Sequence, residues 1–69
     1  MFKIGTIYQD ARDVGGWPEY HEIIGVTMDA IIISDFGMHV DEVEYAITAQ
    51  ELMNKIHSGL WIEQHSGDE

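Results

Sequence analysis

The fold prediction depends most on residues 41–57, which read DEVEYAITAQELMNKIH. Apolar side chains recur in this stretch at the spacing of one helix face, and they are Tyr45, Ala46, Ala49, Leu52, Met53 and Ile56. Asp41 fits the N-cap position and Glu44 the third helical position, which is a capping-box pattern with Asp in the Ser/Thr place. Gly59 fits a left-handed C-cap. The sequence therefore predicts an amphipathic helix of about four to five turns over 41–57.

Extended segments are expected on both sides of this helix, because β-branched and aromatic residues gather there. The three expected strands cover residues 2–8, 17–24 and 60–65. Gly15 and Gly16 lie where the chain must turn into the second strand, so at least one should have positive φ. Pro18 cannot donate to a ladder, so that strand should begin late or lie at an edge. Residues 66–69 are expected to be a frayed acidic tail.

Residues 27–36 fit two different structures. The run Ile31-Ile32-Ile33 favours a strand by its β-propensity. Thr27 is a good N-cap and Gly37 a good residue after a helix end, which together favour a short helix. The residues themselves leave both structures open.

The charge balance excludes several classes of protein. The 69 residues include 13 Asp and Glu against 3 Lys and Arg, so the formal net charge is −10. A protein that binds a phosphate backbone, or an anionic membrane surface, needs clustered cations that this chain lacks. The longest apolar run, 30–33, is far shorter than the ~20 residues of a membrane span. We therefore expect one soluble, cytoplasmic domain over residues 1–69 that binds neither nucleic acid nor membrane directly.

The residues that most often carry catalysis or bind metals show no motif. The four histidines His21, His39, His57 and His65 have no metal-ligand spacing, and the chain has no cysteine. The serines lie in no nucleophile elbow, and no glycine-rich loop resembles a phosphate cradle. The sequence thus predicts scattered polar histidines, no metal, no cofactor and no enzymatic activity.

The carboxylates of the first half of the chain are the most informative feature. Only Lys3 and Arg12 offset the charge of these carboxylates. The carboxylates are Asp10, Asp13, Glu19, Glu22, Asp29 and Asp35. One interpretation is solubility, because acidic faces are often simply solvated. The other is a surface that presents negative charge as DNA does and occupies the DNA-binding groove of a basic partner.

Residues 13–22, DVGGWPEYHE, resemble a known family. The likeness continues through 36–40, FGMHV, and resumes at Met53-Asn54 and at 59–61, GLW. The family is the seventh described family of subtype I-F anti-CRISPR proteins, which are small acidic phage products. Each motif is weak alone, but their common order and spacing make the resemblance moderately specific.

The resemblance implies an α+β fold, ββααβ, in which one long and one short helix pack on a three-stranded antiparallel sheet, with 27–36 as the short helix. It also implies a non-enzymatic monomer that binds the Csy surveillance complex at the basic subunit that reads the protospacer-adjacent motif, and so keeps target DNA out. Where the family has an adjacent acidic pair, this chain has Ile33 and Ser34, and Asp35 is the nearest acidic residue. The expected partner-binding residues are Asp13, Glu19, Glu22, Asp29 and Asp35.

Two further hypotheses remain open at this point. The chain fits an acidic protein-binding module of a phage or bacterium that inhibits or regulates a different nucleic-acid-binding protein. A small metal-dependent enzyme is a third, more distant reading.

Overall fold

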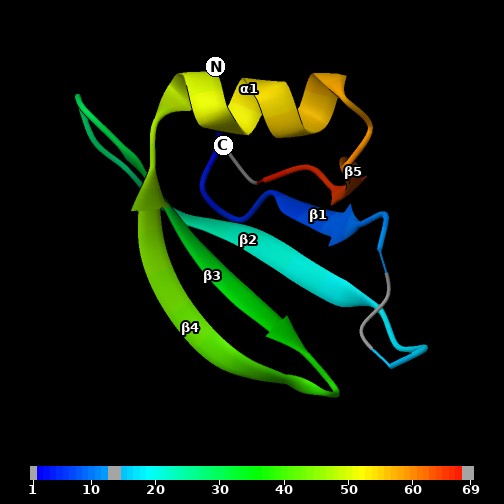
Figure 1. Cartoon of the computed structure of the whole chain (residues 1–69). Coiled ribbons are helices and arrows are strands. Elements are labelled where there is room, and N and C mark those ends of the chain that lie inside the picture. The colour runs from blue at the N-terminus through cyan, green and yellow to red at the C-terminus, as the bar shows by residue number, and fades with distance from the viewer. Residues whose placement is uncertain (1, 13–14, 68–69) are drawn as a thin grey trace.

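Five antiparallel strands and one helix form the described part of the chain, residues 2–12 and 15–67, in a computed structural model (Figure 1). In chain order they are β1 (Ile7–Asp10), β2 (Glu19–Val26), β3 (Ile31–Gly37), β4 (Val40–Ile47), α1 (Ala49–His57) and β5 (Trp61–His65). The strands form one sheet in the order β4-β3-β2-β1-β5. The α+β class is confirmed, but the sheet has five strands instead of the three expected.

Residues 41–47, expected as the first half of the long helix, belong to strand β4 instead. Their side chains also alternate with a period of two, and Tyr45 and Ile47 lie opposite Ile33 and Ile31 of β3. The helix begins later, with Thr48 as its N-cap. The Thr48 hydroxyl accepts from the Glu51 N–H at 3.0 Å, and the Glu51 carboxylate accepts from the Thr48 N–H at 3.0 Å. This second capping box, and not the one at Asp41, starts the helix.

The segment 27–36 is not the short helix that the family resemblance implies. It holds a turn at 27–30 and most of β3, which pairs with β2 on one side and β4 on the other. The β-branched isoleucine run therefore follows its strand propensity, because both neighbouring strands are present to pair with it. The order ββααβ is wrong, and the observed order is ββββαβ.

The other local predictions concern the start of β2, the glycine turn before it, β1 and the C-terminal tail. β2 begins directly after Pro18, as expected for a residue that cannot donate to the ladder. Gly15 and Gly16 have φ of 60° and 85°, which confirms the left-handed turn before it. β1 covers 7–10, so it overlaps the expected strand over 2–8 only at Ile7 and Tyr8. The Gly67 N–H donates to Thr6 Oγ1 at 3.0 Å, so this part of the expected frayed tail is held, while residues 68–69 lie outside the described residues.

The hydrophobic core lies between α1 and one face of the sheet (Figure 1). Its buried members are Tyr8, Ile23, Ile31, Ile33, Ile47, Leu52 and Trp61. Leu52 of the predicted apolar helix face is buried there at 0% exposure, whereas Met53 of the same predicted face is 39% exposed. No helix in residues 2–12 and 15–67 is long and apolar enough to cross a membrane.

Candidate functional site

Polar side chains from three adjacent strands meet on the core-facing side of the sheet. The register pairs Tyr8 of β1 with His21 of β2, and His21 with Asp35 of β3. Because residues two apart on a strand share a face, Asp10 lies on the same side as Tyr8 and His21. Asp10 and His21 are 3% and 2% exposed, so both are taken out of water.

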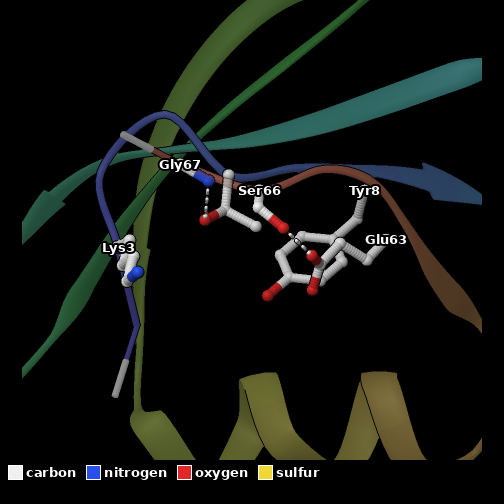
Figure 2. Close-up of a pocket in the computed structure, with 6 residues that line it drawn as sticks. Lys3, Tyr8, Glu63, Ser66 and Gly67 are labelled. Carbon is white, nitrogen blue, oxygen red and sulfur yellow. Dashed lines mark hydrogen bonds between the residues drawn. The ribbon is translucent and has the colours of Figure 1, made fainter. Parts of the chain in front are cut away.

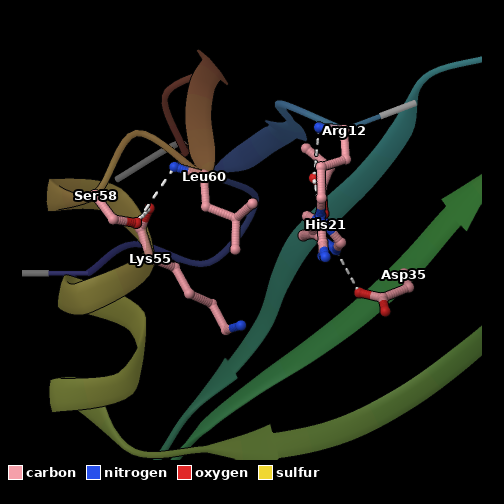
Figure 3. A network of polar contacts seen from close by, with 7 residues as sticks. Arg12, His21, Asp35, Lys55, Ser58 and Leu60 are labelled. Atoms are coloured by element: carbon pink, nitrogen blue, oxygen red, sulfur yellow. Dashed lines mark hydrogen bonds and ion pairs between the residues drawn. The ribbon is translucent and has the colours of Figure 1, made fainter. Parts of the chain in front are cut away.

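His21 is hydrogen-bonded by both ring nitrogens to carboxylates, and Figure 3 shows the bond to Asp35. Its Nδ1 lies 2.6 Å from Asp35 Oδ1, and its Nε2 lies 3.0 Å from Asp10 Oδ2. The Tyr45 hydroxyl donates to Asp35 Oδ1 at 2.7 Å, and the Arg12 backbone N–H donates to Asp10 Oδ1 at 2.8 Å. Among the described residues, no buried side-chain nitrogen or oxygen lacks a hydrogen-bond partner.

The hydrogen bonds determine how charge is arranged in this network. Each ring nitrogen of His21 faces a carboxylate oxygen, and an ionised carboxylate only accepts hydrogen bonds. Burial raises the pKa of Asp10, but hydrogen bonds from Arg12 and His21 outweigh burial and lower that pKa overall. Burial, followed by the bond to Asp35, raises the pKa of Tyr45, which keeps its hydroxyl a donor.

Trp61 of β5 covers the imidazole of His21. The two rings stack with centroids 3.9 Å apart and planes 13° from parallel. On the indole, Lys55 of α1 places its ammonium 5.0 Å from the ring centroid, which is within the range of a cation–π contact. The helix and β5 thus shield the network from solvent.

Glu19 brings a third carboxylate to this group. One ligand atom each from Asp10, Glu19 and His21 lies within 4.8 Å of the others, an arrangement that can hold a metal ion. The sequence interpretation of scattered histidines missed it, because the hydrogen-bond partners of His21 are 11 and 14 residues away along the chain. Only the pairing of β1, β2 and β3 brings these residues together.

The five residues expected to bind a partner do not share one face. Glu19 and Asp35 lie on the core-facing side beside His21, while Glu22 points to the opposite face of β2. Asp29 lies exposed in the turn between β2 and β3, at the other end of β2 from Glu19. Asp13 lies outside the described residues. Their role in binding stays a prediction.

Exposed carboxylates that were not among the expected partner-binding residues gather on the edge strand β4. Asp41, Glu42 and Glu44 are all exposed there. The register also places Glu22 and Glu44 on either side of Ser34, in one row across β2, β3 and β4. The chain has no Lys or Arg between Arg12 and Lys55, so none of the three strands carries a basic side chain other than His21.

A shallow pocket of about 180 Å³ lies near the two ends of the chain (Figure 2). Its lining residues are Lys3, Thr6, Tyr8, Glu63, Ser66 and Gly67. The Ser66 hydroxyl donates to Glu63 Oε2 at 2.6 Å, so these two polar groups are already satisfied by each other. Burial, and then the charge of Glu63, raises the pKa of Tyr8.

Comparison of the chain with protein-family models, with curated proteins and with solved structures finds no match.

Proposed function

We propose that the protein is a non-enzymatic binding protein whose acidic sheet occupies a basic, nucleic-acid-binding surface of another protein. The observation that carries this proposal is the charge of β2, β3, β4 and their connections. This part of the chain has no Lys or Arg, and its carboxylates are Glu19, Glu22, Asp29, Asp35, Asp41, Glu42 and Glu44. A surface of one sign attracts a partner of the other sign and speeds its association.

The exposure of each carboxylate decides which of them can meet a partner. Asp35 is hydrogen-bonded to His21 and Tyr45, so its carboxylate already has partners within the protein. Asp41, Glu42 and Glu44 are exposed, and Glu22 is half-buried on the same side as Glu44. We therefore assign partner contact chiefly to β4 and the outer face of β2, with Asp29 at the turn as a further exposed charge.

The resemblance to the anti-CRISPR family supplies a specific candidate partner, the basic DNA-entry subunit of a type I-F Csy complex. The observed strand order differs from the fold that this resemblance implies. Support for this partner therefore comes from charge and from the short motifs, and not from the architecture. The alternative partner is a different nucleic-acid-binding protein with a basic groove, which the same acidic surface would fit.

A DNA-competition assay tests the proposal. Purified type I-F Csy complex is incubated with the protein and then with labelled target DNA, and bound DNA is measured. We expect the protein to abolish DNA binding when it is added first. In parallel, tagged protein is used to capture basic nucleic-acid-binding proteins from lysate, and each captured protein is tested in the same competition.

The outcomes separate the two partners. Loss of DNA binding by the Csy complex supports the specific partner. An unaffected Csy complex, together with another captured protein that loses its nucleic acid, supports the alternative. If no nucleic-acid-binding protein is displaced in either arm, the proposal is wrong and the acidity serves solubility.

A further inference from the structure

We propose that Asp10, Glu19 and His21 form a binding site for a divalent transition-metal cation of the Zn²⁺ class, with Asp35 as the positioning residue for His21. This site is separate from the exposed acidic surface of β4, and it goes beyond the function proposed above. Its ligands would be one carboxylate oxygen each from Asp10 and Glu19, and Nε2 of His21.

The spacing of the ligand atoms fits one small cation. Ligand atoms that bind one Zn²⁺ at about 2.0–2.2 Å stand roughly 3–3.5 Å apart. His21 Nε2 and Asp10 Oδ2 are 3.0 Å apart, and one ligand atom each of Asp10, Glu19 and His21 lies within 4.8 Å of the others. The Glu19 side chain is half-buried, and its oxygen must come to within that spacing of the other two ligand atoms to bind the same ion.

The ring nitrogen of His21 that would not bind the metal, Nδ1, is hydrogen-bonded to a carboxylate, as is usual for metal-bound histidines. Asp35 Oδ1 lies 2.6 Å from Nδ1, and the Tyr45 hydroxyl in turn donates to Asp35. A carboxylate on the far nitrogen fixes the tautomer that leaves a lone pair on Nε2, aimed at the metal. Arg12 meets Asp10 through Oδ1, so Oδ2 remains on the side of the site.

The charge of the site favours a cation. Continuing the β1–β2 register by one residue beyond Gln9 and Tyr20 places Asp10 opposite Glu19. Like charges directly opposite each other across two strands are destabilising. A divalent cation bound between Asp10 and Glu19 offsets this repulsion with its own positive charge.

The donor set also selects among metals. One imidazole nitrogen with two carboxylate oxygens suits Zn²⁺, Fe²⁺ and Mn²⁺, whereas Mg²⁺ prefers oxygen ligands and keeps its water. Three protein ligands leave a fourth position open, and the partial exposure of Glu19 provides the way in.

Calorimetric titration of the full chain with ZnCl₂ tests the proposal, with MgCl₂ as the comparison ion. The informative pair of variants is Glu19→Gln and Glu22→Gln, because both residues are half-buried on β2 but on opposite faces. We expect one Zn²⁺ per chain for the unmodified protein and Glu22→Gln, and at least a tenfold loss of affinity for Glu19→Gln. Asp35→Asn should weaken binding by about 10–100-fold.

The exposed histidines His39, His57 and His65 make localisation necessary. Mn²⁺ broadens NMR signals of nearby nuclei, so at low Mn²⁺ the ring signals of His21 should broaden first. Equal Zn²⁺ affinity in the two glutamine variants, or broadening that spares His21, would overturn the proposal. No Zn²⁺ binding at millimolar concentration would overturn it as well, and the four side chains would then be only a structural network.

Discussion

The indole of Trp61 lies flat on the imidazole of His21, with ring centroids 3.9 Å apart and planes 13° from parallel. Trp61 also contacts Tyr8, at a centroid distance of 6.0 Å, so one side chain joins the polar network to the hydrophobic core. Trp61 is 3% exposed. The last strand is therefore needed to keep water away from His21 and its two carboxylates.

Replacing the indole of Trp61 should lower the stability of the fold. Trp61→Ala leaves a cavity beside His21 and opens the network to water, and we expect it to lower the free energy of unfolding by about 3–5 kcal/mol. Trp17→Ala is the matched control, because Trp17 is 45% exposed. Its effect should stay within about 0.5 kcal/mol. Urea unfolding followed by circular dichroism measures both, and similar losses in the two variants would contradict the role given to Trp61.

Tyr45 should make stability fall at high pH. Its pKa is raised, by burial first and then by Asp35, so the folded chain keeps a proton that the unfolded chain loses above about pH 10. Stability from this group is full below the ordinary tyrosine pKa and declines as the pH rises past it. Tyr45→Phe removes that dependence together with the hydrogen bond, at a cost of about 1–3 kcal/mol at neutral pH.

Urea unfolding of both proteins at pH 7 and at about pH 10.5 checks this prediction. The stability difference between the unmodified protein and Tyr45→Phe should shrink at the higher pH. The raised pKa of Tyr8 affects both proteins alike and cancels in the difference. A difference that is equal at the two pH values would contradict the assignment to Tyr45.

The capping box at the start of α1 should be sensitive to acid. Hydrogen bonds from the Thr48 backbone and side chain lower the pKa of Glu51. A lowered pKa means that the carboxylate contributes stability above its unfolded pKa and loses it as the pH falls through the folded pKa. Glu51→Gln should therefore unfold with a smaller difference between neutral and acidic pH than the unmodified protein.

Thr48→Ala tests the other half of this capping box. Loss of an N-cap hydroxyl usually costs about 0.5–2 kcal/mol, and here part of that cost should disappear at acidic pH, because the Thr48 side chain helps to lower the pKa of Glu51. Thermal unfolding at several pH values measures both variants. A Glu51→Gln variant with an unchanged pH dependence would show that the cap does not depend on the charge.

The sequence predicted a helix over 41–57, which includes the observed 49–57 but begins too early, and the reason lies in residues 41–47. Val43, Tyr45 and Ile47 alternate as in a strand, while Tyr45, Ala49 and Leu52 also recur as on a helix face. Both periods fit, and two capping boxes compete. The choice is made by β3, whose Ile31 and Ile33 pair with Ile47 and Tyr45, a contact between segments that no local pattern contains.

The candidate site could not be predicted from the sequence, for a similar reason. His21 obtains its partners from β1 and β3, so neither Asp10 nor Asp35 shares a local motif with it. Asp35 was expected at a partner surface, yet it lies at 14% side-chain exposure against His21. The number of carboxylates gives the charge of the chain. The register of the strands decides which of these carboxylates bond to other residues of the protein.

Charge reversal on β4 should weaken partner binding without harming the fold. Glu42 and Glu44 are exposed on an edge strand, so Glu42→Lys with Glu44→Lys removes no core contact. Exposed ion pairs are individually worth only about 0–1 kcal/mol, so neutralising one of them should matter little. Reversal differs, because it adds repulsion against a basic groove. We expect the double variant to lose inhibition in the DNA-competition assay by at least tenfold in effective concentration.

The control reverses charge elsewhere, with Glu63→Lys, because Glu63 is exposed on β5, the strand at the opposite edge of the sheet from β4. Circular dichroism comes first, so that lost binding is not mistaken for lost structure. Raising salt from about 0.05 to 0.5 M should slow association of the unmodified protein, since screening acts on long-range steering. If association does not depend on salt and the β4 variant inhibits fully, the acidic surface is not the partner contact. The stacked Tyr20 and Phe36, on the face of the sheet opposite the core, would then be the contact to test.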